Sequence, residues 1–166
     1  LGIAVQKVYD FIWDEFCDWY IEIAKVRTYK KDENPESANA ALWTLKTVLV
    51  NALKLLHPYM PFITEEIFCT LQSDEETIML SKWPEYKKEW DFPAEENVME
   101  HVKEITRGIR NMRAEMNVPN NRKTKVYVVC EDTEICDGIS TLENSIKPLM
   151  MAEKILVQQT KENIAD

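Results

Sequence analysis

Residues 109–129 read IRNMRAEMNVPNNRKTKVYVV, and within this stretch the pattern of the chain changes from helical to extended. From Pro93 to Asn117 the apolar side chains return every three or four residues, which is the period of an α-helix. Residues 123–130 are instead rich in β-branched side chains, which is typical of a strand. Because proline cannot continue a helix, Pro119 marks the change, and we predict a long helix, a polar turn and a strand.

The same stretch gathers positive charge in a chain of 166 residues whose formal net charge is −9. Between Thr106 and Tyr127 the one acidic residue, Glu115, stands among six basic ones. A second, smaller group of basic residues lies between Ile23 and Lys31 and contains no acid. We call the first group the basic window, and it consists of Arg107, Arg110, Arg113, Arg122, Lys123 and Lys125.

The chain begins with an amphipathic pattern. Over residues 5–26 polar side chains recur every three or four positions among apolar ones, which predicts a helix with one solvated stripe. The first residues look like the middle of a helix rather than a signal peptide, so we expect a piece of a longer protein. Its apolar surface around Val5, Val8 and Phe11 should then be exposed or covered by a second copy, whereas Trp13, Trp19 and Tyr20 should lie in the core.

Two more helices are predicted before the long one. Asn34 followed by proline is a typical helix start, and that helix ends near His57 because another proline follows. Its buried face should consist of apolar residues between Leu42 and Leu56. The helix restarts in PFITEEIFCTL, residues 61–71, with Thr64 as its N-cap or with an earlier start at the first proline.

Irregular structure and a small β-α-β unit complete the prediction. Residues 73–93 are rich in turn residues and aromatic side chains, so we expect a packed crossover. A second strand is predicted at residues 153–158, and a helix capped by Asp132 or Thr133 should connect it in parallel to the first. Two strands make a poor sheet, so a third strand lies beyond Asp166 or helices cover this one.

These elements predict a mainly α fold. We expect a helical bundle over residues 1–118, followed over residues 119–166 by a small α+β (β-α-β) subdomain that is truncated before a further strand.

Composition excludes several classes of function. Apolar runs are far shorter than the roughly 20 residues that cross a bilayer, so we expect no membrane contact and a cytoplasmic protein. With three glycines the chain lacks a phosphate-binding loop and a dinucleotide fingerprint. Its four cysteines form no C-x-x-C pair, so we expect reduced thiols and no metal, with Cys17 and Cys69 buried as small hydrophobic residues.

No catalytic group stands out in the sequence. We expect His57 to pack at a helix end and His101 to lie on a solvated helix face. Glu65 and Glu66 are neighbours on a helix and point in different directions, so they should stabilise its first turn rather than act as an acid pair. We therefore expect no enzyme activity and no cofactor in this chain.

Four segments follow one another in a recognisable order: FIWDEFCDWYIEIAK at 11–25, LLHPYMPFITEEIF at 55–68, TIMLSKWPE at 77–85 and IRNMRAEMNVP at 109–119. Together they resemble the anticodon-binding region of the valyl-tRNA synthetases, which are class I aminoacyl-tRNA synthetases, and the resemblance covers residues 1–159. The leucyl, isoleucyl and methionyl enzymes share the second segment more loosely. Two positions depart from the family: Phe68 replaces a tryptophan, and asparagines at 120–121 replace a more proline-rich turn.

This resemblance implies a parent enzyme that joins valine to its tRNA with ATP, of which the present chain is a non-catalytic piece. The family's catalytic domain, which uses the ATP, and the first helix of the bundle would lie upstream, and a coiled-coil arm would lie downstream. The basic window would face the anticodon stem. The implied tRNA-binding residues are Arg107, Arg110, Arg113, Arg122, Lys123 and Lys125.

Two alternatives stay open. In the first, the chain is the corresponding domain of a leucyl- or isoleucyl-type synthetase. In the second, it is a helical protein-interaction scaffold in which Arg107 or Arg110 pairs with acidic side chains of the first helix, namely Asp10, Asp14, Asp18 and Glu22. Exposure of the basic window to solvent favours RNA binding, whereas burial against carboxylates favours the scaffold.

Overall fold

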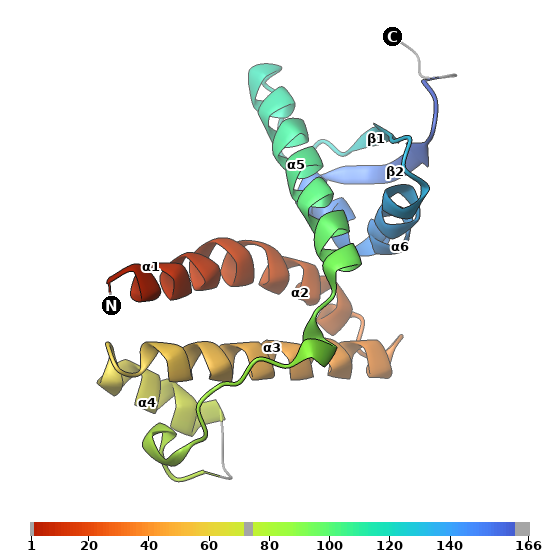
Figure 1. The fold of residues 1–166 in the computed structure, drawn as a ribbon. Helices are drawn as coiled ribbons and strands as arrows, with labels where there is room; N and C mark the ends of the chain where they lie inside the picture. The colour runs from red at the N-terminus through yellow and green to blue at the C-terminus, as the bar shows by residue number, and fades with distance from the viewer. Residues whose placement is uncertain (1, 72–74, 162–166) are drawn as a thin grey trace. The chain divides into compact units, whose positions relative to one another are not determined.

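The protein forms two packing units in a computed structural model that describes residues 2–71 and 75–161 (Figure 1). Unit 1 comprises Leu1–Lys88 and unit 2 comprises Glu89–Asp166. Unit 1 is helical, and unit 2 combines two helices with a two-stranded sheet. The predicted fold class, a mainly α chain with a small β-α-β unit near its end, is confirmed.

Unit 1 begins with one continuous helical segment. It consists of α1 (Gly2–Asp10), the π-helical stretch η1 (Phe11–Ile21) and α2 (Glu22–Tyr29). The helix predicted over residues 5–26 is therefore confirmed, but its centre is wound more widely, with hydrogen bonds from i to i+5. Two residues of this stretch, Phe16 and Trp19, are buried.

Exposure along the segment differs in part from the prediction. Trp19 is buried and Tyr20 half-buried, but Trp13 is 58% exposed, so the prediction of a core position for Trp13 is wrong. It stacks instead on Tyr9, with ring centroids 6.4 Å apart, on a helix face that unit 1 leaves open. Phe11 is 43% exposed on the same segment.

Helix α3 (Pro35–Leu56) lies alongside the first segment (Figure 1). Its start is as predicted, because the Asn34 side chain accepts a hydrogen bond from the Ser37 amide at 3.0 Å. Small buried residues let the helices approach closely: Ala24 on α2, and Ala38 and Ala41 on α3, are at most 1% exposed. Leu42, by contrast, is exposed, so its predicted place on the buried face is wrong.

Helix α4 (Pro61–Leu71) packs against α3 and begins at its proline, the earlier of the two predicted starts. Thr64 is therefore no N-cap, and its hydroxyl donates back to the Met60 carbonyl at 2.8 Å. One core cluster joins Val50 and Leu53 of α3 to Phe68 of α4 and to Ile78. Lys54 places its ammonium 5.8 Å from the centre of the Phe68 ring.

The crossover is irregular as predicted, with the short 3₁₀ turns η2 (Ile78–Leu80) and η3 (Lys88–Trp90). The first residues of the predicted crossover, 73–74, lie outside the described part of the chain. Cys69, which precedes it, is exposed rather than buried, because its thiol lies at the end of α4 and contacts Glu65 and the Glu76 carbonyl.

Unit 2 contains α5 (Pro93–Glu115), β1 (Thr124–Val129), α6 (Thr133–Met150) and β2 (Ala152–Gln158). The strands pair in parallel, with Val126 opposite Ile155. The Asp132 carboxylate caps α6 by accepting from the Glu134 amide at 2.9 Å. Helix α5 packs against α6, and for this reason it belongs to the same unit as the sheet.

Candidate nucleic-acid interface

The structure separates the basic window into exposed residues and one buried residue. Arg113 is only 8% exposed. The other five side chains are exposed: Arg107 and Arg110 on α5, Arg122 and Lys123 in the turn, and Lys125 on β1.

Helix α5 ends in a Schellman motif, which sets the start of this turn. Asn117 has a φ of 53° in the left-handed region, and its amide donates to the Ala114 carbonyl at 3.1 Å. The Val118 amide donates to the Arg113 carbonyl at 2.9 Å. The chain then turns again, because the Arg122 amide donates to the Pro119 carbonyl at 3.0 Å.

Arg113 lies inside this turn. Its Nη2 atom donates to the Pro119 carbonyl at 3.0 Å and to the Arg122 carbonyl at 2.7 Å, while Nη1 donates to the Thr124 hydroxyl at 3.2 Å. The guanidinium thus connects the end of α5 to both ends of the turn and to the first residue of β1. Charged donors of this kind form stronger hydrogen bonds than neutral ones.

Arg110 has a different structural role. Its Nε atom donates to the Leu149 carbonyl at 3.1 Å, in the last turn of α6. A cation at a helix C-terminus satisfies an otherwise unpaired carbonyl and interacts favourably with the helix dipole. Arg110 therefore links α5 to α6 while its side chain also remains exposed.

Sequence reasoning missed Lys154 as a neighbour of the basic window. The sheet register places Lys154 of β2 directly opposite Lys125 of β1, and both side chains are exposed. Like charges at paired positions on one face of a sheet repel each other, so an anion bound there would relieve the repulsion. The sequence predicts the two strands and their parallel pairing, but the register that brings these two lysines together comes from the structure, which has a shift between Thr124 and Lys125.

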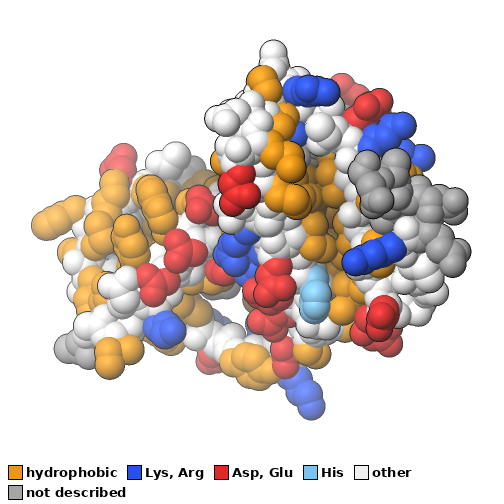
Figure 2. Space-filling model, turned by 90° about the horizontal axis from the view of Figure 1, so that it is seen from above, with side chains coloured by type: hydrophobic (Ala, Val, Ile, Leu, Met, Phe, Trp, Pro, Cys, Tyr) orange, Lys and Arg blue, Asp and Glu red, His pale blue; other side chains and the backbone are white. Residues whose placement is uncertain are grey.

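An acid-free groove adjoins the turn. It has a volume of about 680 Å³ and runs between α5 and β1, where Ile109, Met112, Tyr127 and Val129 are among the lining residues. None of its lining residues is acidic, although the chain as a whole is. Figure 2 shows hydrophobic side chains gathered in a band over unit 2.

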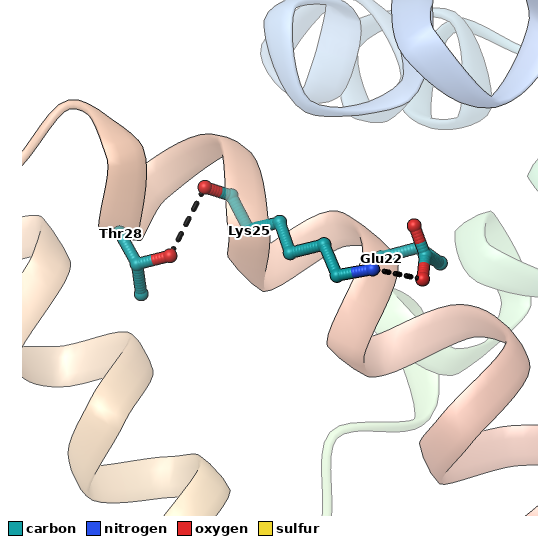
Figure 3. Close-up of polar contacts among 3 residues, drawn as sticks. All are labelled: Glu22, Lys25 and Thr28. Carbon is teal, nitrogen blue, oxygen red and sulfur yellow. Dashed lines mark hydrogen bonds and ion pairs between the residues drawn. The ribbon is translucent and has the colours of Figure 1, made fainter.

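The second basic group of the sequence is engaged in local contacts. Lys25 pairs with Glu22 one turn earlier, at 2.5 Å, and the hydrogen bond from Lys25 to this carboxylate raises the lysine pKa (Figure 3). The Arg27 Nε atom donates to the Ser37 hydroxyl at 2.9 Å, and Lys30 lies 3.4 Å from Glu33. The Arg27 contact ties α2 to the start of α3, and the two ion pairs are local, so we leave the group out of the candidate interface.

The two histidines and Glu65 have structural contacts. His57 Nδ1 lies 2.7 Å from the Thr64 hydroxyl, at the junction of α3 and α4. His101 Nδ1 lies 2.9 Å from the Asn97 carbonyl one turn earlier. Glu65 accepts from the Ile78 amide at 3.2 Å, and its pKa is lowered chiefly by a hydrogen bond from the Thr77 side chain. Glu65 therefore fastens the crossover to α4, a contact that the sequence did not predict.

Two other kinds of site are absent from the described ranges. Within residues 2–71 and 75–161, no helix is long and apolar enough to span a membrane. Among these same residues, no three His, Cys, Asp or Glu side chains are grouped so that they could hold a metal ion.

The fold places the chain in the class of helical domains that carry a small appended α+β unit. The family model described as the anticodon-binding domain of tRNA ligase matches residues 1–128. The chain therefore belongs to the family of anticodon-binding domains of tRNA ligases.

Several relatives carry the name valine–tRNA ligase. The protein from Clostridium tetani is 52% identical over 132 residues, which are 80% of this chain and 15% of the relative. The Clostridium perfringens protein is 42% identical over 164 residues, 99% of this chain and 18% of the relative. The Thermotoga maritima protein is 39% identical over 157 residues, 92% of this chain and 17% of the relative. The chain thus spans only 15–18% of the length of these relatives.

Proposed function

We propose that this chain is the anticodon-binding domain of a valine–tRNA ligase and binds tRNA through the exposed residues of the basic window. The observation that carries the proposal is the exposed turn formed by Arg122 and Lys123, with Lys125 beside it, in a chain of net charge −9. Membership of the anticodon-binding family supports the same partner.

The contacts that we propose are mainly electrostatic. Lysine and arginine contacts to phosphates fix the position of a nucleic acid, whereas base identity is read by stacking and by hydrogen bonds to base edges. The exposed cations would accordingly hold the anticodon stem, with Lys154 extending the surface across the sheet. Arg110 would contribute charge while its Nε atom remains on α6.

We propose the rest of a longer enzyme as the second partner. The relatives named valine–tRNA ligase are several times longer than this chain, and valine activation with ATP would take place in their other regions. The open face of the first helical segment, with Ile3, Phe11 and Trp13 exposed, would pack there. In the isolated chain the same face is available to a second copy. We expect the parent enzyme in the cytoplasm.

Titration of labelled tRNA with the 166-residue chain at several salt concentrations tests the proposal. We expect a dissociation constant of about 10⁻⁴ to 10⁻⁶ M at physiological salt, because a few phosphate contacts supply the affinity. The double reversal Arg122→Glu and Lys123→Glu should weaken binding and lower the slope of log affinity against log salt by about 0.7–0.9 for each lost contact.

The control is Lys46→Glu, which reverses one charge, half the change of the double variant, at an exposed position of α3 in unit 1. It should have a much smaller effect on affinity than the double reversal. Salt-insensitive binding that survives the double reversal would show that the basic window is not the contact surface. A loss of helical circular dichroism in the double reversal would mean that the lower affinity comes from a disrupted fold rather than from lost phosphate contacts.

A further inference from the structure

Arg113 differs from the rest of the basic window because its charge is directed into the protein. It is 8% exposed, and each of its described hydrogen bonds goes to an oxygen of residues 119–124. Within the described part of the chain, no carboxylate is among the hydrogen-bond or ion-pair partners of Arg113. Three of its five N–H donors are thus committed to the turn, and its burial leaves little of the guanidinium open to a phosphate.

The positions of the three acceptors explain what Arg113 can do. Pro119 and Arg122 are the first and last residues of the turn that the Arg122 amide closes, and Nη2 donates to the carbonyls of both. Nη1 reaches Thr124, where β1 begins. A planar guanidinium offers several donors in one rigid fork, whereas a lysine ammonium is a point charge on a flexible stem. Lysine at this position would keep the charge and lose the fork.

We infer that Arg113 is a positioning residue for tRNA, an inference that rests on the proposed function. By binding the inward-facing carbonyls at both ends of the turn, Arg113 fixes the backbone from which Arg122 and Lys123 project into solvent. A cation that is already held in its binding geometry loses less conformational entropy when it meets a phosphate. The buried arginine thus strengthens binding without touching the nucleic acid.

A double-mutant cycle on the 166-residue chain tests this inference. The variants are Arg113→Lys, the pair Arg122→Ala with Lys123→Ala, and their combination, and tRNA affinity is measured for each. We expect Arg113→Lys alone to weaken binding about threefold to tenfold, which is the combined effect of two exposed charge contacts. Once Arg122 and Lys123 are alanine, the same change should weaken binding less than twofold, because nothing remains to be positioned.

Arg107→Ala is the control for a general loss of structure. Arg107 lies on α5 outside the turn, so its effect on affinity should be the same with Arg113 or with lysine at position 113. Amide hydrogen exchange supplies a second readout. Exchange of residues 118–124 should become faster in Arg113→Lys, while exchange in the centre of α6 stays unchanged.

Several results would overturn the inference. Wild-type affinity of Arg113→Lys would show that only its charge matters, and an equal effect in both backgrounds would show a direct contact or a global defect. If the variant with Arg122→Ala and Lys123→Ala binds tRNA with unchanged affinity, the proposed function fails, and the role of Arg113 in tRNA binding fails with it. Amide hydrogen exchange of residues 118–124 then decides separately whether Arg113 orders the turn. If Arg113→Lys does not fold, Thr124→Val, which removes one acceptor, replaces it in the cycle with the same expected direction.

Discussion

Two glycines in unit 2 differ in how much space surrounds them. A Cβ atom added to Gly138 of α6 would lie 2.6 Å from Cγ2 and 2.8 Å from Cγ1 of Val98, whereas one added to Gly108 of α5 would have no neighbour within 4 Å. We therefore expect Gly138→Ala to lower the free energy of unfolding by about 1–3 kcal/mol through overpacking. Gly108→Ala should raise it by about 0.5–1 kcal/mol, because alanine favours the helix.

Urea unfolding followed by circular dichroism measures both changes. The double variant Gly138→Ala with Val98→Ala should recover part of the loss, since shortening Val98 removes the atoms nearest the new methyl group. Equal effects of the two glycine substitutions would contradict this account of the α5–α6 contact.

At the scale of single residues, the sequence predicts contacts that are local in the chain. The caps at Asn34 and Asp132 are correct because each side chain bonds an amide within the next three residues. Exposure of Trp13 and Cys69 was predicted wrongly because it depends on which distant element covers them. The burial of Arg113 escaped prediction for a related reason. Its acceptors belong to a turn whose path the sequence pattern does not specify.

At the scale of elements, Glu143 connects α6 to β2. Its Oε1 atom lies 3.0 Å from the Lys147 ammonium and accepts from the Ile155 amide at 3.4 Å. The hydrogen bond from Lys147, followed by the one from Ile155, lowers the pKa of Glu143 below its ordinary value of 4.5. The folded state then binds fewer protons than the unfolded state at acidic pH. The stability from Glu143 is therefore fully present above pH 4.5 and is lost as the pH falls through the lowered pKa.

We expect Glu143→Gln to lower the free energy of unfolding by about 0.5 kcal/mol at pH 7, the size of a partly exposed ion pair. The difference from the wild type should shrink as the pH falls below 4.5. Glu131→Gln, at an exposed position before α6, is the control and should show little effect at either pH. Urea unfolding at a series of pH values measures these differences, and a pH-independent loss would mean that the carboxylate charge is not involved.

The order and type of the elements could be predicted because their apolar periods differ, between three and four residues in the helices and two in the strands. Parallel pairing followed from the helix that connects β1 to β2. The π-helical winding of η1 was not predicted, because the apolar pattern of residues 11–21 is compatible with an ordinary helix. Lys154 entered the candidate interface only when the strand register was known.

At the scale of the whole molecule, the packing division between Lys88 and Glu89 lets us predict where a protease cuts first. Residues 81–87 have no regular structure, and Lys82 and Lys87 are exposed. Brief treatment with trypsin should therefore cut here before it cuts in α5, because an extended segment fits a protease more easily than a helix. Mass spectrometry of the first products would identify the site. Initial cleavage at Arg107 or Arg110 would contradict the expected order.

The boundary predicted at residue 118 and the packing division between Lys88 and Glu89 rest on different properties of the chain, its sequence pattern and its packing contacts. The sequence pattern changes from helical to extended at Pro119. The match to the family model does not end at this position but continues to residue 128. Packing instead groups α5 with the sheet, because α5 lies against α6. Sequence periodicity indicates where an element ends, but not the neighbour against which its apolar face packs.

The π-helical stretch η1 also bears on how the length of this chain can change during evolution. Each hydrogen-bonded turn of a π-helix contains one residue more than a turn of an α-helix. Losing one residue between Phe11 and Ile21 could therefore convert a wide turn to a normal one and leave the helices on either side in place. One residue gained in this stretch could not be accommodated in the same way, because the turns are already wide. Among homologues, gaps in this stretch should thus be deletions far more often than insertions.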